Sequence, residues 1–280
     1  MAEYLAPAKV NLSLLVAPPR RDGMHPLQSL VQTIEWTDTL GVVRGEARDE
    51  LDSDIEENLV LRALALARDF GDVPPLRMTL DKQIPTEAGL GGGSSDAAAA
   101  LTAAADFGSI DTALLASVAS RVGADVALFL TGGTLMMSGI GESIESVYPA
   151  DGFALAVIVP EFGLSTAEVY SRWDRLEGPE GDVTPDRLLP PSLRGRMPMR
   201  NDLLPAALSL EPFLGDFMAD VATVWGTTVC LTGSGSSCFG YFATVDEAVG
   251  GVAAVEGLIE EGRGVALRDR GVERVSRESR

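Results

Sequence analysis

The sequence predicts an α+β fold. Its 280 residues are 46% hydrophobic, which is enough apolar material for one large core or for two packed domains. Strand-like and helix-like segments follow one another in an irregular order, and no internal repeat is visible. A doubly wound parallel sheet would require strands and helices to alternate regularly, so the α+β class is favoured.

The first predicted strand carries one polar face. Apolar residues at 10, 12, 14 and 16 alternate with Lys9, Asn11 and Ser13. This period of two predicts a half-buried strand. Because alternate side chains of a strand share a face, Lys9 and Asn11 are expected on the same polar surface.

Apolar periodicity, capping residues and glycines predict the remaining elements. Candidate N-caps at 53–57 precede a helix over 58–70, and another helix begins at Asp111 and ends near Gly123. The segment 174–200 is rich in Pro, Gly and charge and predicts an extended surface connection, and the arginine-rich residues 268–280 predict a solvated or frayed tail. Strands are expected at 28–35, 76–81, within 125–148, and at 153–159, 229–231, 239–243 and 264–267, and helices at 94–105, from 166, and at 202–210, 213–224 and 246–261.

A glycine-rich loop precedes the helix predicted at 94–105. Residues 89–93 contain four glycines in five positions, and two serines follow. Glycine backbone can close around an anion, and a helix start adds unpaired N–H groups and a partial positive charge. The loop therefore predicts a phosphate site made of Pro85, Thr86, Glu87, Ala88, Gly89, Leu90, Gly91, Gly92, Gly93, Ser94 and Ser95.

The loop matches neither of the two common phosphate motifs. A Walker loop needs a lysine before its hydroxyl residue, and the dinucleotide motif needs Gly or Ala where this chain has Ser94. A glycine-rich turn packed against a helix, without a ligand, is the alternative interpretation. The second glycine run, residues 233–237, is similarly either a tight hairpin turn or part of a site.

Composition restricts the partners. The formal net charge of −19 argues against nucleic acid and anionic membrane surfaces, so a phosphate site must obtain positive potential locally. Lys9 and Lys82 are the only lysines and are candidates for sites that need a compact ammonium group. Cys230 and Cys238 are interpreted as reduced thiols in a cytoplasmic protein, and no apolar run reaches the length of a membrane span.

Several motifs together resemble a known enzyme family. The segment 85–98 reads Pro-x-x-x-Gly-Leu-Gly-Gly-Gly-Ser-Ser-Asp-Ala-Ala and resembles the central ATP-binding motif of the GHMP kinase superfamily. The triple glycine, together with Arg21-Asp22-Gly23-Met24-His25, is similar to the branch that contains the 4-diphosphocytidyl-2-C-methyl-D-erythritol kinases. The resemblance spans almost the whole chain, because further landmarks of the family occur in the same order at 6–12, 123–126, 139–142, 201–203 and 232–239.

The resemblance implies a two-lobed GHMP kinase fold with the active site in the cleft between the lobes. We place the boundary near residue 150, which gives an N-terminal domain at 1–150 and a C-terminal domain at 151–280. The implied reaction is ATP-dependent phosphorylation of the 2-hydroxyl of 4-diphosphocytidyl-2-C-methyl-D-erythritol, in the non-mevalonate route to isoprenoid precursors. ATP, Mg²⁺ and a small-molecule substrate are the implied ligands, and a monomer or weak homodimer is expected.

The family's site residues carry over onto matching positions of this sequence. Asp125 corresponds to the catalytic base and Lys9 to the lysine beside it, although spacing alone would also allow a turn residue and a surface lysine. Asn58, otherwise a helix cap, corresponds to an asparagine near the adenine. The substrate-binding positions are Asn11, Met24, His25, Thr166 and Tyr170.

The role of His25 has an open alternative, because this only histidine could also be structural or solvated. The sequence also departs from the branch at two positions: Met24 stands where the branch has tyrosine, and Ala127 stands where it has proline. A GHMP kinase acting on a mevalonate-like or homoserine-like alcohol would lack the Asp-Gly-x-His element. A non-catalytic nucleotide-binding relative would be expected to lack Lys9 or Asp125.

Overall fold

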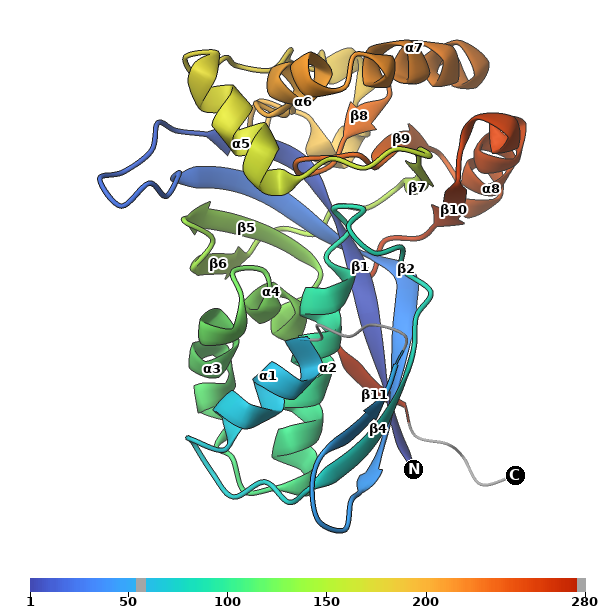
Figure 1. The fold of residues 1–280 in the computed structure, drawn as a ribbon. Helices are drawn as coiled ribbons and strands as arrows, with labels where there is room; N and C mark the ends of the chain where they lie inside the picture. The colour runs from blue at the N-terminus through green and yellow to red at the C-terminus, as the bar shows by residue number, and fades with distance from the viewer. Residues whose placement is uncertain (54–58, 276–280) are drawn as a thin grey trace.

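The computed structural model describes residues 1–53 and 59–275 and contains two sheets, each covered by helices (Figure 1). The larger sheet has the strand order β11-β1-β2-β4-β3, with β5 beside β2 and β6 beside β5. Its pairs are antiparallel except for the parallel pair β3–β4. The strands are β1 (Ala2–Val16), β2 (Leu27–Arg44), β3 (Glu50–Asp52), β4 (Leu76–Asp81), β5 (Thr134–Gly139), β6 (Ser143–Ser146) and β11 (Glu273–Val275).

Four helices pack on one face of the larger sheet (Figure 1). They are α1 (Leu59–Ala67), α2 (Gly92–Phe107), α3 (Leu115–Val122) and α4 (Val126–Thr131). Helix α2 is central, and its residues 97–101 are completely buried. Four of these five residues are alanines, whose small side chains let the helix axis lie close to the sheet and to its neighbours. This packing fixes the N-terminus of α2.

The smaller sheet has the antiparallel order β10-β7-β9-β8. Its central strand β7 is apolar and buried along its whole length, as its continuous run of apolar residues predicted. The strands are β7 (Ala154–Val159), β8 (Cys230–Leu231), β9 (Cys238–Phe242) and β10 (Glu261–Val265), and the helices are α5 (Thr166–Arg175), α6 (Leu204–Leu210), α7 (Phe213–Trp225) and α8 (Val245–Ala254). Short 3-10 helices occur at Thr112–Leu114, Asp186–Leu188, Pro191–Leu193 and Glu256–Leu258.

Strands β1 and β2 extend from the larger sheet to the helices of the second half (Figure 1). They pair from Ala2 opposite Val42 to Val16 opposite Leu27, with a register shift after Pro7. Near its end, β1 also bonds to the second half, since the Leu14 N–H donates to Arg200 O at 2.8 Å. The alternation predicted only residues 9–16 of β1, because residues 6–9 are buried on both faces and Ala6, Pro7 and Ala8 show no polar–apolar alternation that would extend the pattern back to Ala2.

The structure confirms the α+β class and corrects several local predictions. Residues 126–131 form helix α4 instead of a strand, since the apolar run of five residues at 126–130 is compatible with either state. Strands β5 and β6, within the same predicted segment, are confirmed. Helix α8 ends at Ala254, earlier than predicted, and the irregular connection 174–200 buries Leu189, Leu193 and Met199.

The arginine-rich segment 268–275 is held against the larger sheet, so the prediction of a frayed tail is wrong for these residues, although Asp269, Arg270 and Arg274 are exposed to solvent. Arg268 is 4% exposed and donates to Glu35 Oε2 at 2.7 Å and to Glu273 Oε2 at 2.8 Å. Strand β11 pairs with the start of β1, with Glu3 opposite Val275. Local composition could not indicate a carboxylate partner more than 230 residues away in the chain. Residues 276–280 lie outside the described residues, as do Asn58 and most of the candidate caps at 53–57.

The chain passes from the larger to the smaller sheet between β6 and β7, around residue 150. We keep the division into 1–150 and 151–280 as a proposal, with β11 returning to the larger sheet. Among the described residues, no helix combines the length and apolar character needed to cross a membrane.

Candidate active site

A cavity of about 760 Å³ lies where β1, the two glycine loops and α5 meet. It also borders the β1–β2 connection and residues 124–125. Residues from both halves of the molecule therefore contribute to its walls. The cavity brings together many of the predicted site residues, namely Lys9, Asn11, Met24, His25, Gly89, Gly91, Asp125, Thr166 and Tyr170.

Lys9 and Asn11 share one face of β1, as the alternation predicted. The Lys9 ammonium donates to Asn11 Oδ1 at 2.7 Å, and the Asn11 amide donates to Ser29 Oγ at 2.7 Å. The second bond directs Asn11 Oδ1 toward Lys9. Burial lowers the pKa of Lys9, while the charge of Asp125 acts in the opposite direction. The site thus holds a desolvated cation with a fixed orientation.

Asp125 lies immediately before α4 and about one third of its side chain is exposed. Its carboxylate makes no capping bond to α4 and instead lies 3.9 Å from Lys9 Nζ. A turn-stabilising aspartate would accept bonds from the following N–H groups. Burial, and secondly the charge of Asp125, raise the pKa of Tyr170 to about 12. Because the Asp125 carboxylate makes no capping bond to α4, it is available to a molecule in the cavity.

The first glycine loop requires glycine at two positions. Gly89 and Gly91 both have a φ of 75°, and a Cβ on Gly91 would lie 2.7 Å from the Phe129 ring. Gly91 is the N-cap of α2, whose first turn contains no acidic residue. The Ser95 hydroxyl is buried near this helix start and has no hydrogen-bond partner among the described residues. The backbone N–H groups of the first turn of α2, which have no intrahelical partner, and the unpaired Ser95 hydroxyl are suited to binding a phosphate.

The other predicted loop residues do not line the cavity. Ala88 and Leu90 are buried in the core beneath the loop, and the Leu90 carbonyl accepts from the Lys9 N–H at 2.9 Å. Gly93 is exposed, whereas Gly92 and Ser95 are buried. Pro85, Thr86, Glu87 and Ser94 occupy the flanks of the loop outside the cavity wall.

Substituting Gly93 is expected to weaken ATP binding without disturbing the fold. A Cβ on Gly93 meets nothing within 4 Å, whereas a Cβ on Gly92 would lie 3.1 Å from both Ile84 and Lys82 Nζ. Gly93→Val should therefore obstruct only a ligand at the start of α2, and we expect ATP affinity measured by calorimetry to fall at least about tenfold, roughly 1.4 kcal/mol. Gly250→Val is the matched control, because Gly250 is an open helical glycine in α8. Equal affinities in both variants would contradict the assignment of the loop.

The second glycine loop, residues 233–237, packs against the first. Thr232 Oγ1 accepts from the Asn11 N–H at 2.8 Å, and Ser237 Oγ donates to Ala88 O at 2.5 Å. A Cβ on Gly89 would lie 3.0 Å from Gly235 O. Since Gly233 and Ser234 line the cavity, this loop is part of its wall and not only a hairpin turn.

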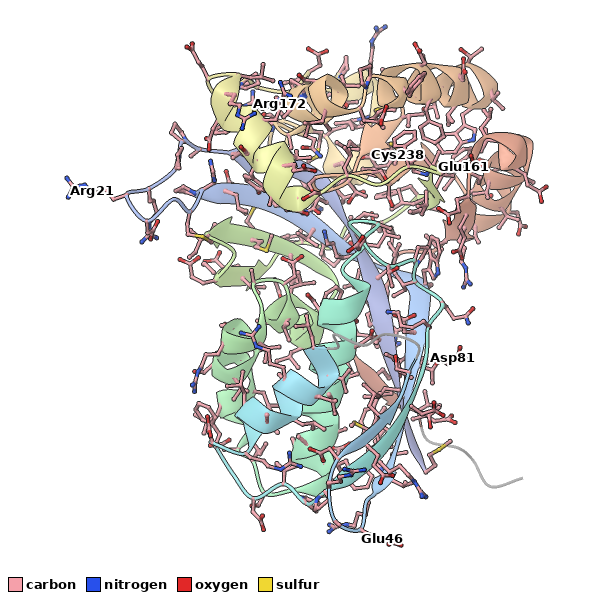
Figure 2. The ribbon with its side chains drawn as sticks, viewed as in Figure 1. Arg21, Glu46, Asp81, Glu161, Arg172 and Cys238 are labelled. Atoms are coloured by element: carbon pink, nitrogen blue, oxygen red, sulfur yellow. The ribbon has the colours of Figure 1, made fainter. Side chains whose placement is uncertain are left out.

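His25 lies at the end of the β1–β2 connection and contacts α5. Its Nε2 is 2.8 Å from Asp174 Oδ1, and its ring centroid is 5.0 Å from that of Tyr170. Met24 beside it is 47% exposed, and Thr166 at the start of α5 bonds to Ser234 at 2.8 Å. Figure 2 shows Arg21 of the same connection pointing away from the rest of the molecule.

A buried ion-pair cluster near the start of α2 was not predicted as a unit. Lys82 Nζ donates to Asp38 Oδ2 at 2.5 Å and to Asp96 Oδ2 at 2.8 Å, and both aspartates are essentially inaccessible to solvent. Burial alone would lower the pKa of Lys82, but the charges of Asp96 and Asp38 raise it overall. Burial and then the charge of Asp38 raise the pKa of Asp96 to about 7. Lys82 was indicated by the scarcity of lysine, whereas its partners on β2 and α2 had no local sequence signal.

The chain is similar to known kinases over most of its length. Residues 58–133 match the family model described as the GHMP kinases N terminal domain. The 4-diphosphocytidyl-2-C-methyl-D-erythritol kinase of Chelativorans sp. (strain BNC1) is 36% identical over 88% of each chain. The corresponding kinase of Sinorhizobium medicae (strain WSM419) is 37% identical over 89% of this chain and 88% of its own.

Solved structures give the same relationship. A crystal structure of 4-(cytidine 5'-diphospho)-2C-methyl-D-erythritol kinase superposes with a TM-score of 0.81 at 32% identity, covering 94% of this chain and 99% of that one. The homoserine kinase from Cytophaga hutchinsonii has a TM-score of 0.69 at 15% identity, covering 98% and 97%, which shows a shared fold alone. The chain belongs to the 4-diphosphocytidyl-2-C-methyl-D-erythritol kinase family of the GHMP kinases and is a small-molecule kinase.

Proposed function

We propose that this kinase transfers the γ-phosphoryl group of ATP to the 2-hydroxyl of 4-diphosphocytidyl-2-C-methyl-D-erythritol. The observation that carries the proposal is the position of Lys9, Asn11 and Asp125 in one cavity, beside the glycine loop that opens α2. Phosphoryl transfer requires positioning, neutralisation of charge on the transferred group and a group that orients the attacking hydroxyl. These three requirements match three features of the cavity.

In this mechanism, Asp125 accepts the proton of the attacking hydroxyl. Lys9, 3.9 Å from Asp125 Oδ2, stabilises the developing oxyanion and the equatorial oxygens of the transferred phosphoryl group. Asn11 holds the Lys9 ammonium through the 2.7 Å bond to its Oδ1. The N–H groups of Gly92 and Gly93 at the start of α2 bind the phosphate chain of ATP.

The residues at the start of α2 also fit a magnesium ion carried by ATP. The described residues contain no group of three or more His, Cys, Asp or Glu side chains that could hold a metal. Mg²⁺ commonly keeps several waters and binds through substrate phosphates with one or two protein ligands. The unpartnered Ser95 hydroxyl, or Ser94 beside it, supplies an oxygen for the ion or one of its waters. When bound, the ion neutralises charge on the phosphates.

The cytidylyl end of the substrate is proposed to occupy the part of the cavity formed by Met24, His25 and Tyr170, with Thr166 near its phosphates. A flat aromatic surface and a ring nitrogen suit a planar base with hydrogen-bonding edges. Met24 offers a thioether in place of a second ring, which packs on an aromatic face with less directional preference. Asn58 remains proposed near the adenine.

A coupled ADP-release assay tests this function directly. The cytidylyl substrate, mevalonate and homoserine are offered at equal concentrations with Mg²⁺ and ATP. We expect turnover only with the cytidylyl substrate, and turnover with either of the other alcohols alone would overturn the proposal. Omitting Mg²⁺ in the presence of a chelator should stop the reaction.

We further propose a cytoplasmic monomer or weak homodimer without nucleic-acid or membrane partners.

His25→Ala is expected to raise the KM for the cytidylyl substrate far more than the KM for ATP. A lost hydrogen bond to a buried base corresponds to about 1–3 kcal/mol, or roughly a fivefold to 150-fold rise. Steady-state kinetics with each substrate varied in turn measures both constants. Parallel increases in the two constants would instead assign His25 a purely structural role.

A further inference from the structure

A histidine–aspartate pair lies at one side of the cavity. His25 Nε2 is 2.8 Å from Asp174 Oδ1, and both residues line the cavity wall. The two side chains come from opposite halves of the molecule, since His25 follows β1 and Asp174 belongs to α5. The His25 side chain is 10% exposed and that of Asp174 is 41% exposed. The histidine is therefore largely enclosed, with one ring nitrogen already occupied.

One face of α5 fixes the position of the His25 ring. Tyr170, Trp173 and Asp174 are spaced at i, i+3 and i+4 and so lie together on the helix surface. The His25 ring centroid is 5.0 Å from that of Tyr170 and 5.5 Å from that of Trp173, and the Trp173 ring is nearly perpendicular to it. Trp173 is buried and is itself held by a 3.0 Å bond to Pro179 O. The orientation of the imidazole is thus set by a rigid surface.

The partner of Nε2 determines the chemistry of the other ring nitrogen. An ionised carboxylate can only accept hydrogen bonds, so Nε2 of His25 must carry a proton. In the neutral imidazole, Nδ1 is then an acceptor. Among the described residues, Nδ1 of His25 has no protein hydrogen-bond partner. A ligand that bonds to Nδ1 of the neutral ring must therefore present a donor.

We propose that Asp174 is a positioning residue that fixes the tautomer of His25 and makes the cavity select a base with an amino group over one with a carbonyl at the same place. The inference rests on the proposed function, in which a cytosine occupies this part of the cavity. Cytosine carries an amino donor where uracil carries a carbonyl oxygen. A carbonyl opposite the unprotonated Nδ1 would bring two acceptors together and leave both without a partner.

The test compares the cytidylyl substrate with its uridylyl counterpart, which differs only in the base. The ratio of kcat/KM for the two substrates is measured in the wild type, Asp174→Asn and Asp174→Ala. An asparagine amide can either accept from or donate to Nε2, so both His25 tautomers become available. We expect the ratio to fall about tenfold in Asp174→Asn. The change should appear in the KM for the cytidylyl substrate and not in kcat or in the KM for ATP. Asp174→Ala removes the hydrogen-bond partner of Nε2 altogether, and alanine is a good helix former at this helical position.

Glu168→Gln serves as the matched control, because it removes one negative charge from the first turn of the same helix at an exposed position outside the cavity wall. Its base-selectivity ratio should equal that of the wild type. Unchanged ratios in the Asp174 variants, or equal losses for both substrates, would overturn the inference while leaving the proposed function intact. Failure of the wild type to phosphorylate the cytidylyl substrate would overturn the proposed function and, with it, this inference.

Discussion

Asp125→Asn should abolish phosphoryl transfer while both substrates remain bound. Asparagine keeps the shape of the side chain and one acceptor oxygen, but it cannot take the hydroxyl proton or carry the charge that lies 3.9 Å from Lys9. General-base catalysis contributes about 10²–10⁴-fold to a rate. Single-turnover phosphorylation with saturating ATP and acceptor measures the chemical step. Asp220→Asn, at an exposed position on α7, is the control for loss of one carboxylate.

The partnership of Asp125 with Lys9 is tested by combining the substitutions. Since the two groups act on the same transition state, Lys9→Ala together with Asp125→Asn should be little slower than the more damaging single variant. If Asp125→Asn keeps more than about a tenth of the wild-type rate, the loss is smaller than the low end of the general-base contribution. That result would remove Asp125 from the mechanism. Additive losses in the double variant would show that the two residues act independently.

Lys82→Met is expected to cause the largest loss of stability among the substitutions considered. The ammonium of Lys82 bonds to both Asp38 and Asp96, which are 0% and 1% exposed. Removing it leaves two buried carboxylates facing each other without a cation, and breaking a buried ion pair from one side costs about 3–5 kcal/mol. Urea denaturation should therefore show a lower midpoint at an unchanged m-value. The loss should increase with pH, because protonation relieves the repulsion between the carboxylates.

A second substitution distinguishes charge from packing in this cluster. Asp96→Asn removes one of the two negative charges and keeps an acceptor for the remaining groups. If repulsion causes the loss, Lys82→Met combined with Asp96→Asn should be more stable than Lys82→Met alone, which a double-mutant cycle measures. Equal stabilities of these two variants would attribute the loss to the missing side-chain contacts of Lys82.

The sequence was most informative where the signal is local. The alternation around Lys9 and Asn11 predicted their common face, and the glycine content of residues 89–93 predicted the open start of α2. The rarity of lysine also singled out Lys82, whose ammonium contacts two buried carboxylates, and Lys9, which lies 3.9 Å from the partly exposed Asp125. Each of these features depends on residues within a few positions of one another, or on composition.

Long-range pairings could not be predicted in the same way. Asp174 lies 149 residues from His25, and Asp38 lies 44 residues from Lys82. Neither aspartate has neighbours that distinguish it from a solvated carboxylate, because the partner is supplied by tertiary packing. The helix at 126–131 was missed for a related reason, since its apolar residues are buried by α2 and α3 and show no helical periodicity within six positions.

The pairing of β11 with β1 restricts the order in which the polypeptide can fold during its synthesis. Residues 3–5 leave the ribosome well before their neighbours in the sheet, residues 273–275, which emerge only after both glycine loops have been made. Gly271 and Val272 also bond to Thr131 and Phe129, so α4 receives its last partners equally late. Until then one edge of β1 has unpaired N–H and C=O groups and can pair with other nascent chains. Such distant pairings also slow folding, which prolongs the interval in which a chaperone would shield that edge.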